Sequence, residues 1–171
     1  MLRPIVKFGD RILNDKAAAV DDITPEIDCV IDEMIAAMHA APGIGLAAPQ
    51  IGIPLRICVV DLSVGRRPED LRVMINPAFV ERAGTQLEEE GCLSVPGFTS
   101  AVVRPRTVII KGLDLNGKEV TVEGKDLLAR AFCHEMDHLN GVFFLDHLSF
   151  IKRDIIKRKI RKLVKQGEWE R

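Results

Sequence analysis

Residues 126–141 read DLLARAFCHEMDHLNG and predict a helix that ends at Asn140-Gly141, because no earlier residue in the stretch breaks a helix. His134 and His138 are four residues apart, so both imidazoles lie on one face of that helix. They can reach a common metal ion, and Glu135, at the edge of the same face, can reach a water bound to that ion. The stretch therefore predicts a catalytic metal centre built on a helix.

A catalytic metal site usually has three protein ligands, so two histidines leave one ligand to be found. The metzincin pattern would need a histidine where Phe144 stands. Downstream, His147 or Asp154 would complete a zinc endopeptidase. Upstream, Cys92 is the preferred candidate, because the adjacent Gly91 lets the backbone of a tight loop approach a ligand closely. An isolated cysteine is more often a buried structural thiol.

A third segment, residues 42–50, reads PGIGLAAPQ and is small, apolar and glycine-rich, with one polar side chain at its end. It does not fit a dinucleotide-binding loop, because Ala48 occupies the third glycine position and a helix precedes the segment. On the residues alone, Gln50 either belongs to a site or caps the turn after Pro49.

Elements along the chain favour an α+β fold. A helix is predicted from Thr24-Pro25 to Pro42-Gly43, with Thr24 as its N-cap. Strands are predicted at 55–60 and 73–75, with a weaker continuation at 78–87, and at 102–103, 108–115 and 119–122 around a hairpin turn at Asn116-Gly117. The strands cluster between helical ends, which does not match alternating βαβ units.

Together, the three segments closely resemble peptide deformylase. Gly43–Gln50, Glu90–Ser94 and His134–His138 match the three signatures of that family, in family order. The resemblance covers essentially the whole chain and implies antiparallel β-sheets packed around a central helix that carries the HExxH motif. Two positions depart from the pattern: Cys133 stands where many members have glutamine, and Thr99 where some bacterial members have an arginine near the substrate entrance.

The resemblance implies a hydrolase that removes the formyl group from the N-terminal formylmethionine of nascent peptides and releases formate. Cys92, His134 and His138 would be the metal ligands, with Glu135 as general base. The Gln50 amide and the Leu93 backbone N–H would stabilise the oxyanion. The resemblance also implies a Glu90–Arg104 ion pair. We expect the substrate to contact six residues: Gly43, Ile44, Gly45, Gly91, Leu127 and Ala131.

The three proposed ligands do not identify the metal. One thiolate and two imidazoles accept zinc, iron(II), nickel or cobalt, and the thiolate leaves a divalent ion with a formal charge of +1. The resemblance implies one divalent ion, Fe²⁺ natively, with Zn²⁺, Ni²⁺ or Co²⁺ as possible substitutes.

Composition is typical of a globular protein: 171 residues, of which 47% are hydrophobic and 29% charged. We predict one catalytic domain over residues 1–171. The chain shows neither a secretory signal pattern nor a span of transmembrane length, and its four cysteines lack disulfide-framework spacing. These features predict a cytoplasmic protein without a membrane or DNA partner, in which Cys29 and Cys58 belong to the core.

A basic helix is predicted at about 149–166. Residues 150–171 contain nine Lys/Arg against three acids, a net +6, so residues 1–149 carry −7 of the total −1. The basic face is either a solvated surface or a site that docks on ribosomal RNA. A ribosome- or nucleic-acid-binding protein with a structural metal site is therefore a further alternative. We expect an apolar stripe of this helix to pack on the body: Phe150, Ile151, Ile155, Ile156, Ile160, Leu163 and Val164.

Overall fold

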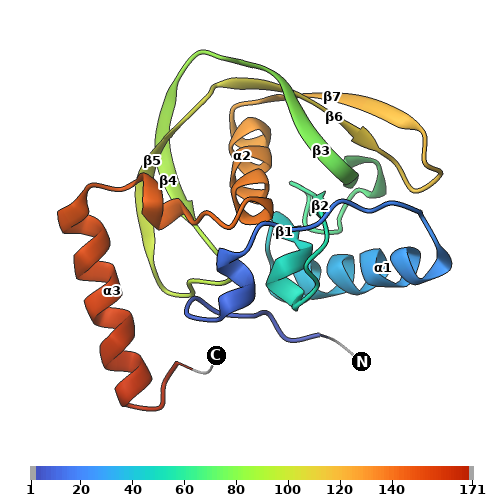
Figure 1. Ribbon diagram of the computed structural model, residues 1–171. Helices are drawn as coiled ribbons and strands as arrows, with labels where there is room; N and C mark the ends of the chain where they lie inside the picture. Colours follow the sequence, from blue (N-terminus) through green and yellow to red (C-terminus); the bar gives the residue numbers. More distant parts are fainter. Residues whose placement is uncertain (1–2, 170–171) are drawn as a thin grey trace.

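Two antiparallel sheets and three α-helices make up the fold of the computed structural model, which describes residues 3–169 (Figure 1). The helices are α1 (Pro25–Ala40), α2 (Leu127–Leu139) and α3 (Phe150–Lys165). The larger sheet has the order β1-β2-β3-β6-β7, formed by Gly45–Ala47, Ile57–Val60, Arg72–Ala83, Thr107–Leu113 and Glu119–Lys125. The smaller sheet pairs β4 (Gln86–Gly91) with β5 (Thr99–Arg104). The predicted α+β class with antiparallel sheets is confirmed.

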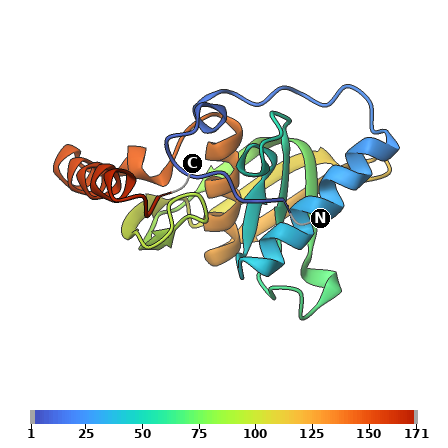
Figure 2. The ribbon, with the colours of Figure 1, turned by 90° about the horizontal axis from the view of Figure 1, so that it is seen from below.

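Strand β2 shows how the helices cover the larger sheet. All four of its residues are buried, and they alternate between two faces. Cys58 and Val60 pack in the cluster that includes α2, whereas Ile57 and Val59 pack in the cluster that includes α1. Figure 2 shows α1 and α2 on opposite sides of the sheet, with β4, β5 and α3 beyond α2. Helix α2 is therefore central, and ten of its thirteen residues are buried.

Most predicted elements are present. Helix α1 starts after Thr24 and ends before Pro42, although the Thr24 side chain makes no capping bond to the helix. The predicted hairpin turn joins β6 to β7, with Gly117 in the left-handed region at φ 72°. Helix α2 ends at Asn140-Gly141, as expected. The predicted strand at 78–87 is instead the end of β3 and the start of β4, separated by a turn at Gly84.

Two predictions of burial are wrong. Cys29 is exposed, because it lies two residues, or about 200°, around α1 from the buried Ile27. On α3 only part of the apolar stripe packs: Ile156 and Ile160 are buried, with Leu163 and Val164 against the same cluster. The seven stripe residues span too wide an arc for one face, so three of them stay exposed: Phe150 (74%), Ile151 (70%) and Ile155 (48%).

Within residues 3–169, no helix has both the length and the apolar content needed to cross a bilayer.

Candidate active site

Three side chains from two distant segments converge beside α2. The Sγ of Cys92 lies 3.1 Å from Nε2 of His138, which lies 3.1 Å from Nε2 of His134. One ligand atom from each of the three residues falls within 4.8 Å of the others. A tetrahedral ion with bonds of about 2.0–2.3 Å sets its donors roughly 3.3–3.7 Å apart. The three donors thus fit one divalent ion after small shifts.

The helix and the loop after β4 produce this convergence. His134 and His138 are one turn apart on α2, with ring centroids 4.8 Å apart and the rings edge to face. Cys92 immediately follows β4, which brings it to the same helix face. The other two candidates lie elsewhere: His147 Nε2 is 2.7 Å from Asp137 Oδ2, and Asp154 pairs with Arg158 at 2.7 Å. Neither joins the donor group, so the geometry gives the endopeptidase no support.

Glu90 is the buried carboxylate that orients His134. One of its oxygens accepts a hydrogen bond from His134 Nδ1 at 2.7 Å, which leaves Nε2 of that ring for a metal. Arg104 donates at 2.6 and 3.1 Å, as the predicted ion pair requires, and Arg130 donates at 2.8 Å. Burial alone would raise the pKa of Glu90, but the hydrogen bonds and charges of His134 and Arg104 hold that pKa well below its ordinary value. Glu90 therefore stays ionised.

Replacing Glu90 with glutamine should weaken both the fold and the metal site. The change removes the carboxylate that neutralises the buried Arg130 guanidinium and leaves Arg104 paired with Asp137 alone, which should destabilise the protein by about 3–5 kcal/mol. Loss of the carboxylate behind His134 should weaken metal binding about 10–100-fold. Urea unfolding and chelator competition measure the two effects. The matched control is Glu88→Gln, an exposed carboxylate on the same strand. A Glu90→Gln protein as stable and as tight for metal as this control would refute the role.

Glu135 points a carboxylate into the same site. The residue is 3% exposed, and its Oε2 has no hydrogen-bond partner among the described residues. Burial raises the pKa of Glu135 to about 7, within the range in which a carboxylate exchanges protons near neutral pH. Gly45 makes room for it, since a Cβ there would lie 3.0 Å from the Glu135 Cδ and closer still to an oxygen. Gly45 thus serves the packing of Glu135, a reason that the sequence alone did not suggest.

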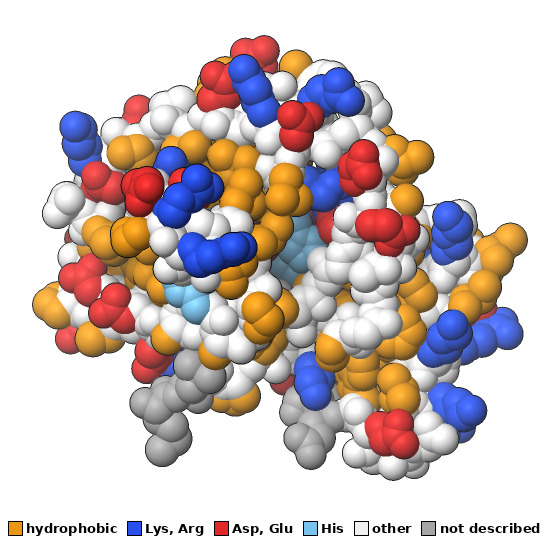
Figure 3. Space-filling model, turned by 180° about the vertical axis from the view of Figure 1, so that it is seen from behind, with side chains coloured by type: hydrophobic (Ala, Val, Ile, Leu, Met, Phe, Trp, Pro, Cys, Tyr) orange, Lys and Arg blue, Asp and Glu red, His pale blue; other side chains and the backbone are white. Residues whose placement is uncertain are grey.

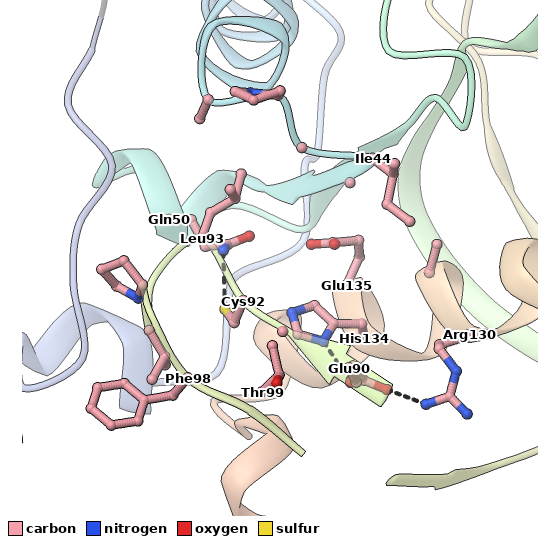
Figure 4. A pocket seen from close by; sticks show the side chains of 18 of the residues that line it. Ile44, Gln50, Glu90, Cys92, Leu93, Phe98, Thr99, Arg130, His134 and Glu135 are labelled. Atoms are coloured by element: carbon pink, nitrogen blue, oxygen red, sulfur yellow. Dashed lines mark hydrogen bonds and ion pairs between the residues drawn. The ribbon is translucent and has the colours of Figure 1, made fainter. Parts of the chain in front are cut away.

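Gln50 and Leu93 lie on the other side of the donor group. The Gln50 Oε1 accepts from the Ala47 N–H at 2.8 Å, so the side chain does cap its turn. Its Nε2 donates to the Ser94 hydroxyl at 3.1 Å and lies 3.7 Å from Cys92 Sγ (Figure 4). The Leu93 backbone N–H makes no backbone hydrogen bond among the described residues. The second Gln50 N–H is therefore directed at the metal donors, and the Leu93 N–H remains for a ligand beside them.

A cavity of about 620 Å³ opens onto these groups. Figure 3, which views the molecule from behind, shows the cavity as a hollow near the centre of this face. Histidine atoms lie at its floor and hydrophobic side chains lie along one side. Thr99 lines the cavity as well. The six residues predicted to contact substrate all line it: Gly43, Ile44, Gly45, Gly91, Leu127 and Ala131.

Arg130 was missed by the sequence reading. It is 4% exposed, lines the cavity and donates to the Glu90 carboxylate and to the Val102 carbonyl. A signal was available, because Arg130 stands four residues before His134 and therefore on the same helix face. A charged residue in that buried stripe indicates a buried partner of opposite charge.

Cys133, the other departure from the family pattern, directly precedes His134 in sequence. It is buried on α2, and burial raises the pKa of its thiol to about 11. Its sulfur is not part of the donor group. The residue therefore packs as a neutral thiol.

Comparison with known proteins gives one consistent answer. The family model described as polypeptide deformylase matches residues 2–154. A peptide deformylase of Acidobacterium capsulatum is 46% identical over 169 residues, covering 99% of each chain. Among solved structures, a peptide deformylase from Legionella pneumophila matches with a TM-score of 0.92 at 38% identity, over 100% of both chains. That of Thermus thermophilus matches with a TM-score of 0.86 at 34% identity, over 98% of each.

Proposed function

Since this chain belongs to the polypeptide deformylase family, we propose that Cys92, His134 and His138 hold its metal ion and that Glu135 is its general base. The activity is the metal-dependent removal of the N-terminal formyl group from nascent peptides, with release of formate. The observation that carries the assignment of residues is the clustering of three donor atoms within 4.8 Å, next to the unpartnered Oε2 of Glu135.

Glu135 moves the proton in the proposed mechanism. A divalent ion held by Cys92, His134 and His138 would supply Lewis acidity toward water and the formyl carbonyl. Glu135 accepts a proton from the water that attacks the formyl carbon. When the C–N bond breaks, the carboxyl group delivers this proton to the leaving amine. A pKa raised to about 7 by burial suits both transfers, because the group can then hold or release a proton near neutral pH.

Gln50 and Leu93 stabilise the charge that develops on the formyl oxygen. The Gln50 amide is fixed by the Ala47 N–H on one side and by Ser94 on the other, so its second N–H, 3.7 Å from Cys92 Sγ, is held toward the metal donors before substrate arrives. The Leu93 N–H supplies the second donor. Preorganised donors of this kind are each worth about 10²–10³ in rate.

The cavity binds the methionine side chain in this proposal. Ile44, Leu127 and Ala131 line it with apolar groups beside His134 and Glu135. Leu127 is 49% exposed, so a bound side chain would also cover apolar surface that now faces solvent. Gly43, Gly45 and Gly91 flank the path of the peptide backbone.

We propose Fe²⁺ as the native ion, with Zn²⁺, Ni²⁺ or Co²⁺ as substitutes. The Cys92 thiolate and the two imidazoles are compatible with all four metals. Iron(II) bound in this way should be sensitive to oxidation by air.

Anaerobic purification, elemental analysis and a formate-release assay on one sample test the function and the ion together. We expect about one iron per chain and release of formate from formyl-Met-Ala-Ser, with activity lost on exposure to air. Full activity with stoichiometric zinc alone would refute Fe²⁺ as the native ion, but it would not refute Cys92, His134 and His138 as the ligands. No formate release from a fully metallated sample would refute the function.

We also propose that α3 docks on ribosomal RNA near the emerging chain, which would place the protein in the cytoplasm. The outward face of α3 carries exposed cations, among them Lys159, Lys162 and Lys165. Phosphate contacts by such side chains release counter-ions, so binding should weaken steeply as salt rises.

A pair of charge reversals tests the docking proposal. Lys159→Glu with Lys162→Glu should reduce ribosome co-sedimentation and flatten its salt dependence, while formate release stays unchanged. The matched control reverses Lys111 and Lys118, which are exposed on β6 and on the following turn. Equal binding by the two double variants, or binding insensitive to salt, would contradict docking through α3.

A further inference from the structure

Trp169 lies beyond the region matched by the family model, yet it is buried against the catalytic body. It is the only tryptophan of the chain and is 6% exposed. Its indole Nε1–H donates to the Phe8 carbonyl at 3.0 Å. Its ring packs 6.3 Å from that of Phe98, with an angle of 58° between the planes. Figure 1 shows how the chain turns back after α3 toward the N-terminal segment.

The segment that Trp169 covers is tied to both sides of the proposed oxyanion site. The Val6 N–H donates to the Gln50 carbonyl at 2.8 Å, and the Phe8 N–H donates to the Ser94 carbonyl at 2.8 Å. Ser94 in turn holds the Gln50 side chain through its hydroxyl. Residues 6–8 therefore connect the turn that carries Gln50 to the loop that carries Cys92. The hydrogen bond from Trp169 to the Phe8 carbonyl holds this connecting segment in place.

Phe98 brings the same contact to the substrate cavity. It lines the cavity together with Val95, Pro96 and Gly97, on the loop that follows Cys92. Figure 4 shows this loop running from Cys92 to Phe98 along one side of the pocket. The Phe98 side chain is only partly buried in its cluster, and the Trp169 ring is one of the groups that it packs against.

We propose that Trp169 is a positioning residue for substrate binding, acting through Phe98 and Phe8 on the cavity wall. This inference rests on the proposed site. Trp169 is not one of the residues that line the cavity and is not in the donor group, so it should affect peptide affinity without affecting metal content. An aromatic contact and a hydrogen bond are each worth about two- to tenfold, and because the effect reaches the cavity only through Phe98 and Phe8, we expect a change of about three- to tenfold.

The KM and kcat of Trp169→Ala and Trp169→Phe test the proposal. For formyl-Met-Ala-Ser, we expect the alanine variant to raise KM about three- to tenfold, with kcat within about twofold and the metal content unchanged. The phenylalanine variant, which keeps a ring but loses the N–H, should recover part of the difference. Ile160→Ala removes another buried side chain of the same cluster, away from the cavity, and should leave KM unchanged. An unchanged KM in Trp169→Ala, or the same rise in Ile160→Ala, would overturn the proposal.

A second measurement does not depend on the folding of any Trp169 variant. In a metallated Glu135→Gln protein, which should bind the peptide without hydrolysing it, emission from Trp169 should change saturably as formyl-Met-Ala-Ser is added. If binding is seen by calorimetry and the emission stays constant, Trp169 is not coupled to the cavity. Formate release by the unmodified protein is measured separately, so failure of this inference remains distinct from failure of the proposed function.

Discussion

Cys92→Ser is expected to lose the metal ion and formate release together. The hydroxyl of serine is a far poorer ligand than a thiolate, and only His134 and His138 would remain. Loss of a group that merely supports a ligand already weakens metal binding 10–100-fold, so loss of the ligand itself should exceed about 100-fold. Metal content after gel filtration and kcat/KM measured with limiting metal should fall in parallel.

Cys133→Ser is the matched control for this change. Cys133 is a buried thiol adjacent to His134 in sequence, whereas Cys92 is half-buried, and the Cys133 sulfur lies outside the donor group. It should keep a full equivalent of metal. If Cys92→Ser retained metal and activity as well as the control does, a different third ligand would have to be sought.

Glu135→Gln should keep the metal and lose catalysis. The amide fills the same space beside Gly45 but cannot take a proton from the attacking water. General-base catalysis contributes about 10²–10⁴-fold, so kcat should fall by a factor in that range. Single-turnover formate release and elemental analysis on the same protein separate the two properties. A variant with near-normal kcat would exclude Glu135 as the base. If the variant lost its metal, the missing ion and not the missing base would account for the loss of activity.

The two histidines were predictable from the sequence because the spacing of four residues fixes their relation on any helix. The proposed third ligand was harder to predict, since Cys92 lies 42 residues before His134 and no local rule relates it to α2. The glycine beside Cys92 made it the preferred candidate, but only the resemblance to a family assigned it to the same metal as the histidines. The structure brings the two together by way of β4, a strand that the sequence reading only partly foresaw.

The sequence alone could not predict which side chains surround each residue of the site. Glu90 was expected beside Arg104, but its bonds to His134 and Arg130 depend on three elements meeting around one carboxylate. The role of Gly45 depends in the same way on the position of Glu135. On α3 and around Cys29, hydrophobic pattern predicted burial that the packing does not provide, because each helix contacts the body along a narrow arc only.

X-ray absorption spectroscopy at the edge of the bound metal tests the central claim most directly. On the active, anaerobically purified protein, the account predicts one sulfur at about 2.3 Å, two imidazole nitrogens at about 2.0–2.1 Å and at least one further light ligand from solvent. A first coordination sphere without sulfur, or one filled by four protein donors, would contradict it.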